Sequence, residues 1–273
     1  MNRLLLLVPV LLLTGCTALF FQPMERQVYS PGDLNLDYRD MYFPSLDGTH
    51  LHGWWLPATG KARGSVLFLH GNAENISTHI GSVMYLPQQG LNVLLIDYRG
   101  YGRSGGTAYL QGVLMDVEAG LGQLVKLDDT GNLAVFGQSL GAALAILAVA
   151  NSQYRDFIEV LVADSSFTGF RDIAREKLDA HWLTWLLQWP LAISITGDYR
   201  PADAIASLPP TAVILVHSRA DQVIPFHHVE TLYALAREPR QLWVVDNARH
   251  IEFFSAPENQ KLLAERIQQW FRE

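Results

Sequence analysis

The sequence predicts an α/β fold in which helices cover both faces of a mostly parallel, eight-stranded sheet. Apolar and β-branched runs alternate with helical patterns at a regular pace from about residue 38 onward. Several of these runs are hydrophobic without interruption, as strands are when both faces of their sheet are covered. The chain has 273 residues, of which 49% are hydrophobic and 17% charged, so it can bury a large core as one domain.

The expected strands can be assigned in order along the chain. They span residues 38–43, 51–56, 65–69, 92–96, 133–136, 160–163, 211–216 and 241–245. The first two are separated by a short turn containing Asp47 and Gly48, so we expect an antiparallel hairpin at one edge of the sheet. Helical patterns fit between the later strands, which should therefore be parallel. In such a sheet, chemistry is expected at the carboxyl ends of the strands.

The start of the chain has the pattern of an export signal. Arg3 precedes an apolar run at residues 4–13, which matches the hydrophobic core of a signal peptide and is too short to span a bilayer. Leu13-Thr14-Gly15-Cys16 resembles the bacterial lipobox, whose cysteine receives a diacylglyceryl group and becomes the N-terminus after cleavage. We expect a lipoprotein signal peptide at residues 1–15, a lipidated tether at 16–31 and a globular domain at 32–273. An uncleaved signal anchor is the alternative, because residues 18–21 prolong the apolar stretch.

Composition excludes several classes of protein. Cys16 is the only cysteine, so neither an intramolecular disulfide nor a zinc cluster built on cysteines is possible. The formal net charge is −7 and no run of Lys or Arg is present, so the chain has no electrostatic footprint for nucleic acid.

A candidate nucleophile lies at residues 137–141, Gly-Gln-Ser-Leu-Gly. The expected strand 133–136 precedes this segment and an Ala-rich helical run at 142–150 follows it. This is the context of a nucleophile elbow, in which a sharp strand-to-helix turn exposes the Oγ of Ser139. A glycine-tightened loop with a solvated serine is the structural alternative.

A serine at its ordinary pKa is a weak nucleophile and needs a base and an orienting acid, expected later in the chain in the order Asp, His. Asp221 follows the strand 211–216, and His250 follows the last strand, 241–245. Asp164 at the end of strand 160–163 is a second candidate acid. We favour Asp221 and expect Asp164 to cap the turn that follows it.

An acyl-transfer site also needs N–H donors for the oxyanion of the tetrahedral intermediate. The strand 65–69 ends in His70-Gly71-Asn72-Ala73. The backbone N–H of Asn72, or alternatively that of Ala73, could act together with the N–H of Leu140.

These segments together resemble the α/β-hydrolase superfamily, and most closely its serine-aminopeptidase-like and acyl-protein-thioesterase-like members. The resemblance rests on His70-Gly71-Asn72, on residues 97–104 (Asp-Tyr-Arg-Gly-Tyr-Gly-Arg-Ser), on the elbow, on the Asp221 segment and on His250. It implies the α/β-hydrolase fold and a Ser139–His250–Asp221 triad that hydrolyses an ester or thioester of a small or lipid-like acyl substrate, without a cofactor. A serine peptidase or aminopeptidase, with Glu176 or Asp179 gripping the substrate ammonium, is an alternative, and a catalytically inactive binding lipoprotein is another.

Two other patterns are assigned to structure. Residues 100–105, Gly-Tyr-Gly-Arg-Ser-Gly, fit a dinucleotide-binding turn, but no helix is expected to open at Gly105, so we interpret them as a structural loop. His227 and His228 are adjacent and should point in different directions, and no His-Glu-x-x-His pairing exists, so no metal site is predicted.

The segment at about 168–205 is expected to form a short helical lid. Trp182, Trp185, Leu186 and Trp189 recur at helical spacing, and an aromatic lid favours acyl groups over sugars or polyanions. A helix packed on the body is the structural alternative. We further expect a monomer held by its N-terminal lipid at the bacterial cell envelope, with the periplasmic face of the outer membrane favoured because Thr17 follows the cysteine.

Overall fold

The computed structural model describes residues 21–179 and 199–271. The predicted signal peptide, Cys16 and the four lid residues Trp182, Trp185, Leu186 and Trp189 lie outside these ranges. No helix in the described part of the chain is long and apolar enough to cross a membrane.

The predicted fold class is confirmed: eight strands form one sheet in the order β1-β2-β4-β3-β5-β6-β7-β8. The pairings of β1 with β2 and of β2 with β4 are antiparallel, and the other five are parallel. The predicted hairpin is therefore correct. The strands are β1 (Arg39–Pro44), β2 (His50–Leu56), β3 (Gly64–Leu69), β4 (Leu91–Asp97), β5 (Leu133–Gln138), β6 (Ile158–Asp164), β7 (Ala212–Ser218) and β8 (Arg240–Val245).

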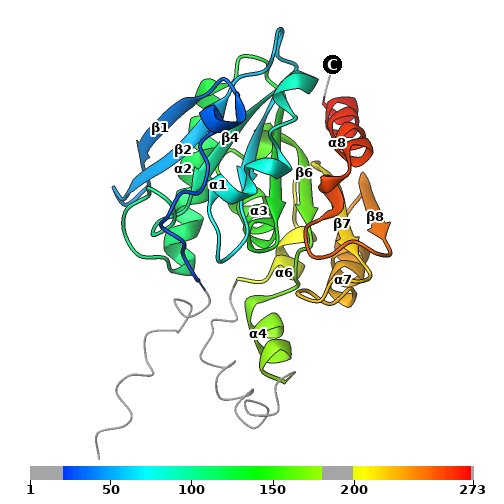
Figure 1. Ribbon diagram of the computed structural model, residues 1–273. Coiled ribbons are helices and arrows are strands. Elements are labelled where there is room, and N and C mark those ends of the chain that lie inside the picture. Colours follow the sequence, from blue (N-terminus) through cyan, green and yellow to red (C-terminus); the bar gives the residue numbers. More distant parts are fainter. Residues whose placement is uncertain (1–20, 180–198, 272–273) are drawn as a thin grey trace, which may run out of the picture.

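Helices cover both faces of this sheet (Figure 1). The described helices are α1 (Ile76–His79), α2 (Leu110–Leu127), α3 (Leu140–Asn151), α4 (Phe170–Asp179), α6 (Pro201–Ile205), α7 (His227–Leu235) and α8 (Pro257–Trp270). Short 3₁₀ turns occupy Pro31–Leu34, Ile80–Ser82, Pro87–Gln89, Arg155–Phe157 and Phe253–Ser255. One apolar cluster joins α2, α3, α6 and α7 to the sheet, and a second joins α1 and α8 to its opposite face.

Burial explains why the central strands lack the polar alternation of a half-exposed sheet. Every residue of β3, β4, β5, β6 and β7 is buried. In α3, every residue except Asn151 is buried, as expected for a helix that is apolar around its whole circumference. The sheet and α3 therefore provide a rigid base for the loops at the carboxyl ends of the strands.

The predicted lid begins with α4 and ends with α6. Figure 1 shows α4 projecting from the lower edge of the body. The described part of the predicted tether, from Phe21 onward, runs along the body and reaches this same edge. Phe21 is only 5% exposed and belongs to the first apolar cluster.

Candidate active site

Ser139 occupies the sharp turn between β5 and α3. Its backbone has φ 53° and ψ −114°, a positive-φ conformation that a non-glycine residue adopts only under strain. The Ser139 N–H donates to the carbonyl oxygen of Asp164 on β6 at 2.8 Å, which ties the turn to the neighbouring strand. The surrounding sheet and helix therefore hold the serine in the geometry of a nucleophile elbow.

The two glycines of the elbow are required by close backbone contacts. A Cβ on Gly137 would lie 2.2 Å from the carbonyl oxygen of Gly141, and a Cβ on Gly141 would lie 2.0 Å from that of Leu69. Both neighbours are backbone atoms and cannot move aside as a flexible side chain can. The spacing of glycines around Ser139 is thus fixed by the packing of α3 on β3 and β5.

The structure brings the predicted base and the favoured acid together. His250 follows β8, and its Nδ1 lies 2.7 Å from Oδ2 of Asp221, which follows β7. The Asp221 side chain is fully buried, while that of His250 is 16% exposed. The second carboxylate oxygen, Oδ1, accepts the N–H groups of Val223 at 2.7 Å and Ile224 at 2.9 Å.

These donors keep Asp221 ionised. Burial alone would raise the pKa of this carboxyl, but the hydrogen bond and charge of His250 and the N–H groups of Ile224 and Val223 outweigh burial and lower the pKa below its ordinary value. The ionised carboxylate of Asp221 accepts a hydrogen bond from the Nδ1–H group of His250. Nε2 of the neutral ring is then unprotonated, which is the form that a general base needs.

Within the described residues, no hydrogen bond joins Ser139 to His250. The two lie on loops at the same carboxyl edge of the sheet, after β5 and β8. Catalytic hydrogen bonds are often long in the absence of substrate and tighten when it binds. The structure therefore assembles the acid and the base directly, and the role of Ser139 as their partner stays a prediction.

Asp164, the alternative acid, has different partners. Its Oδ2 accepts Nε2 of Gln138 at 3.0 Å, and its Oδ1 accepts the hydroxyl of Ser165 at 3.1 Å. Burial raises the pKa of this carboxyl to about 6, although the hydrogen bond from Gln138, the charge of His250 and the hydrogen bond from Ser165 oppose the shift. The expectation that Asp164 caps the following turn is wrong, because its carboxylate accepts side-chain donors from inside the core rather than the N–H groups of that turn.

The predicted oxyanion loop, residues 70–73, lies against the elbow. A Cβ on Gly71 would be 3.5 Å from Cβ of Ser139. The side-chain oxygen of Asn72 accepts the hydroxyl of Tyr101 at 2.7 Å and the N–H of Gln22 at 2.9 Å. Ala73 has a positive φ of 62°, which marks a tight turn here. The choice between the Asn72 and Ala73 N–H groups remains a prediction.

Leu140 supplies the other expected oxyanion donor. It is the first residue of α3, and the first N–H groups of a helix have no acceptor within the helix. Such N–H groups also form the positive end of the helix dipole, which favours a developing negative charge.

The sequence did not reveal that residues 21–28 contact the oxyanion loop. Asn75, the N-cap residue of α1, is completely buried and donates both amide hydrogens to this segment, to the carbonyls of Met24 at 2.9 Å and Arg26 at 2.8 Å. Met24 also accepts the N–H of Gly102 at 2.9 Å. The acceptors in these contacts are backbone carbonyls, which every residue carries, so no pattern of side chains could have predicted them.

The glycine-rich loop at 100–105 lacks the helix that a dinucleotide-binding turn requires at this point, as expected. No helix opens at Gly105, because α2 begins five residues later at Leu110. A Cβ on Gly102 would lie 1.9 Å from Oδ2 of the buried Asp97, so this glycine is required by packing. Arg99 fills the space behind the loop and pairs with Asp116 at 2.8 Å.

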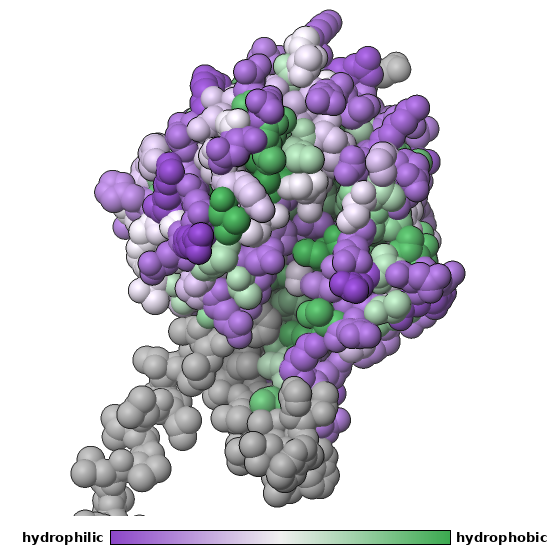
Figure 2. Space-filling model, viewed as in Figure 1, coloured by the Kyte–Doolittle hydropathy of each residue, from purple (hydrophilic) through white to green (hydrophobic). Residues whose placement is uncertain are grey.

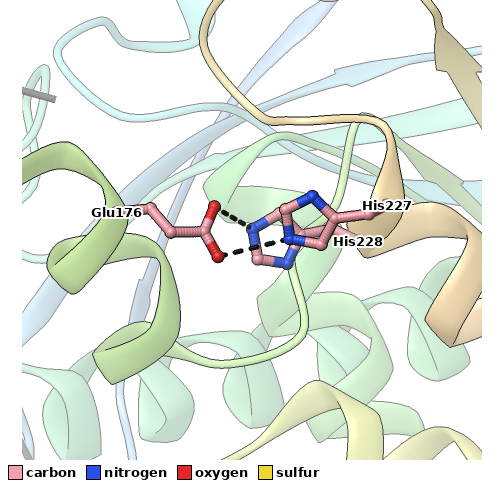
Figure 3. Close-up of side chains that lie close together, drawn as sticks. All are labelled: Glu176, His227 and His228. Atoms are coloured by element: carbon pink, nitrogen blue, oxygen red, sulfur yellow. Dashed lines mark hydrogen bonds and ion pairs between the residues drawn. The ribbon is translucent and has the colours of Figure 1, made fainter. Parts of the chain in front are cut away.

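The prediction that His227 and His228 point in different directions is wrong. Figure 3 shows both rings directed at Glu176 of α4. Each Nε2 lies 3.2 Å from one carboxylate oxygen, and the rings stack with centroids 4.4 Å apart. Both residues begin α7, and their rings are long enough to bring Nε2 atoms together although their Cβ atoms point apart. His228 is 1% exposed.

The three donor groups lie within 4.8 Å of one another, close enough to consider a metal ion. The tautomer of His228 argues against coordination. Its Nδ1 accepts the N–H of Thr168 at 3.2 Å and therefore carries no proton, so Nε2 holds the proton and donates it to Glu176. A neutral histidine ligand needs the opposite arrangement. The cluster connects α4 to α7 by hydrogen bonds.

Comparisons with known proteins identify the family of this chain. The family model described as "Serine aminopeptidase, S33" matches residues 60–204. The protein YfhR of Escherichia coli is 34% identical over 242 residues, covering 86% of this chain and 81% of YfhR. The α/β hydrolase domain-containing protein WAV2 of Arabidopsis thaliana is 32% identical over 228 residues, covering 79% of this chain and 72% of WAV2.

Solved esterase structures share the fold. The Pyrococcus furiosus esterase Pf2001 superimposes with a TM-score of 0.74 at 24% identity, covering 91% of this chain and 99% of that one. Acetyl xylan esterase 1 from Thermoanaerobacterium gives a TM-score of 0.67 at 15% identity, covering 91% and 87%. At these identities the likeness concerns the fold alone.

Proposed function

Because this chain belongs to the serine aminopeptidase S33 family of α/β-hydrolases, we propose that it is a serine hydrolase that cleaves an ester or thioester through an acyl-enzyme. The observation that carries the proposal is the 2.7 Å hydrogen bond between His250 Nδ1 and the buried carboxylate of Asp221, at the edge of the sheet where Ser139 occupies a strained elbow.

The reaction follows from the roles these groups can take. Ser139 Oγ attacks the acyl carbonyl while Nε2 of His250 removes its proton, and Asp221 stabilises the imidazolium that forms. The N–H groups of Leu140 and Asn72 hold the oxyanion. Collapse of the intermediate expels the alcohol or thiol, which takes the proton from His250. Water then attacks the acyl-enzyme by the same steps and releases the acid and the free serine. No cofactor is needed.

A serine peptidase or aminopeptidase is the second candidate, and the family description favours it. An aminopeptidase needs an acidic group to grip the substrate ammonium. Glu176, one of two candidates, already accepts hydrogen bonds from His227 and His228 through both carboxylate oxygens. This engagement supports an acyl substrate over an N-terminal amine. An inactive binding lipoprotein would not need the hydrogen bond between His250 and the buried carboxylate of Asp221.

We also propose that Cys16 carries the lipid that holds the protein at the envelope membrane. The support is the lipobox-like Leu13-Thr14-Gly15-Cys16 after a short apolar run. Two or three acyl chains would suffice for stable anchoring, which a single chain would not provide.

Fluorophosphonate labelling of the purified protein tests the nucleophile. We expect wild type to be labelled and Ser139→Ala to remain unlabelled while its circular dichroism spectrum is unchanged. On p-nitrophenyl esters of rising chain length, Ser139→Ala should lose a factor on the order of 10⁴ to 10⁶ in kcat. Activity of this variant equal to that of wild type would end the serine-hydrolase assignment. Faster cleavage of aminoacyl p-nitroanilides than of esters would favour the peptidase.

A further inference from the structure

We infer that residues 21–28, here called the N-terminal strap, hold the mouth of the active site at the membrane surface, so that the substrate is an acyl ester embedded in the membrane that anchors the enzyme. This inference rests on the proposed function, because it names the substrate class of the same site. The short connection between Cys16 and the strap favours a membrane amphiphile over a soluble ester as the substrate.

The strap is attached directly to the predicted oxyanion loop. The N–H of Gln22 donates to the side-chain oxygen of Asn72 at 2.9 Å. Two residues further on, the carbonyl of Met24 accepts from Gly102 and from Asn75. The strap therefore lies within hydrogen-bonding reach of the loop that faces Ser139.

Buried groups fix the strap in place. Asn75 is completely inaccessible to solvent and uses both amide hydrogens on the strap, while the Ser77 hydroxyl, also buried, accepts the N–H of Val28 at 2.9 Å. Phe21 is 5% exposed within the apolar cluster that also contains Tyr101. Detaching the strap would expose Phe21 and remove both acceptors of the Asn75 amide, which is unfavourable.

The distance from this attachment to the proposed lipid is short. Five peptide steps separate Cys16 from Phe21, and five steps extend to at most about 18 Å. With a lipid on Cys16, the oxyanion loop is thus confined to within about two nanometres of the bilayer surface. A freely diffusing substrate would gain nothing from this confinement, whereas a substrate in the same bilayer is met at a high effective concentration.

Apolar and aromatic side chains are exposed at the end of the strap, directly after it and on the acid loop. The strap region presents Val28, 44% exposed, and Tyr29, 53% exposed, and the acid loop presents Val223, 41% exposed, two residues after Asp221. Figure 2 shows hydrophobic surface in the hollow between the body and α4. Apolar side chains beside an aromatic with a polar tip favour the boundary between lipid and water.

The test changes the length of the connection and leaves the strap itself intact. Twenty Gly/Ser residues are inserted between Thr17 and Ala18. The matched control carries the same insertion between Gly60 and Lys61, in an exposed loop before β3. This loop lies at the amino-terminal end of the parallel strands, which is the edge of the sheet opposite the active site. Each full-length, palmitate-labelled protein is reconstituted into phosphatidylethanolamine–phosphatidylglycerol vesicles containing umbelliferyl oleate, and p-nitrophenyl acetate is assayed in the same vesicles.

Lengthening the connection from five to 25 steps should lower the effective concentration by about tenfold, since this quantity falls with the 3/2 power of length. We expect hydrolysis of umbelliferyl oleate to fall by this factor in the Thr17–Ala18 insertion variant and to be unchanged in the control, with p-nitrophenyl acetate cleaved equally by all three proteins. Equal oleate hydrolysis by the three proteins, a parallel loss on both esters, or a wild type without acyl label would overturn the inference. Failure of wild type to cleave either ester would instead refute the proposed function.

Discussion

Replacing Asp221 with asparagine is the sharpest test of the proposed triad, because the structure dictates how the new amide must point. Oδ1 of Asp221 accepts two backbone N–H groups, from Val223 at 2.7 Å and Ile224 at 2.9 Å. An NH₂ group cannot face two N–H donors. The amide oxygen of the introduced side chain would therefore take the Oδ1 position, and its NH₂ would face Nδ1 of His250 across the 2.7 Å hydrogen bond.

The forced orientation reverses the tautomer of His250. With an N–H donor opposite, Nδ1 must accept, so the proton of the neutral ring moves to Nε2 and the base can no longer take a proton from Ser139. Loss of the correct tautomer in a serine triad costs on the order of 10⁴ in kcat, which corresponds to roughly 5.5 kcal/mol of activation free energy. Folding should be little affected, since every donor around the side chain keeps an acceptor or gains one.

Steady-state hydrolysis of a p-nitrophenyl ester by Asp221→Asn and Asp164→Asn measures this difference. Within the described residues, the Asp164 carboxylate accepts hydrogen bonds from Gln138 and Ser165 and none from His250, so its amide variant should keep kcat within about tenfold of wild type. Urea titration of both variants controls for unfolding. If Asp221→Asn kept more than a tenth of the wild-type kcat, the tautomer argument would be refuted. The reverse ranking of the two variants would move the acid to Asp164.

Three further predictions concern stability and anchoring. Gly141→Ala places a Cβ 2.0 Å from the carbonyl oxygen of Leu69 and should lower the urea-unfolding free energy by about 3 kcal/mol, whereas no loss would show that α3 can shift. Burial raises the pKa of Asp164 from 3.8 to about 6. The folded state therefore binds this proton more tightly than the unfolded state does. The resulting stabilisation is complete below about pH 4 and is lost as pH rises through about 6. This loss should amount to about 3 kcal/mol in wild type and be absent in Asp164→Asn, compared by urea midpoints at about pH 4 and about pH 7. Cys16→Ala should abolish incorporation of radiolabelled palmitate in a bacterial host, and a wild type that takes up no label would contradict the lipoprotein assignment.

The strands could be predicted because their signal is local. Each strand from β3 to β7 is buried along its whole length and contains at least four consecutive apolar residues, although β4 and β6 also bury Asn92 and Glu159 near their starts. The order of strands in the sheet could not be read in this way. Only pairing across the sheet decides that β4 lies between β2 and β3, and no run of residues in one strand records its neighbour.

Parts of the site that depend on contacts between distant segments were missed. The strap contains no apolar periodicity, and its attachment consists of backbone carbonyls held by Asn75, about 50 residues away in the chain. The convergence of His227 and His228 had the same origin. Helical geometry separates their Cβ atoms, but Glu176 from another helix supplies two oxygens that both rings can reach.

The two candidate acids show how the environment separates groups that look alike in sequence. Asp164 ends the buried strand β6 and Asp221 follows the buried strand β7, and burial disfavours the charged form of each. Asp221 offsets burial with a hydrogen bond and the charge of His250 and with two backbone N–H donors, so its pKa falls. Asp164 has hydrogen bonds from Gln138 and Ser165 and feels the charge of His250 without a hydrogen bond to it, and burial outweighs these, so its pKa rises to about 6. A triad acid must be ionised at neutral pH to hold an imidazolium, and divergent pKa values within one site distinguish the roles of two carboxyls. The loop after β7 sets the number and kind of hydrogen-bond donors around the Asp221 oxygens, and these donors favour Asp221 as the triad acid. The sequence alone did not show which donors would surround each carboxylate.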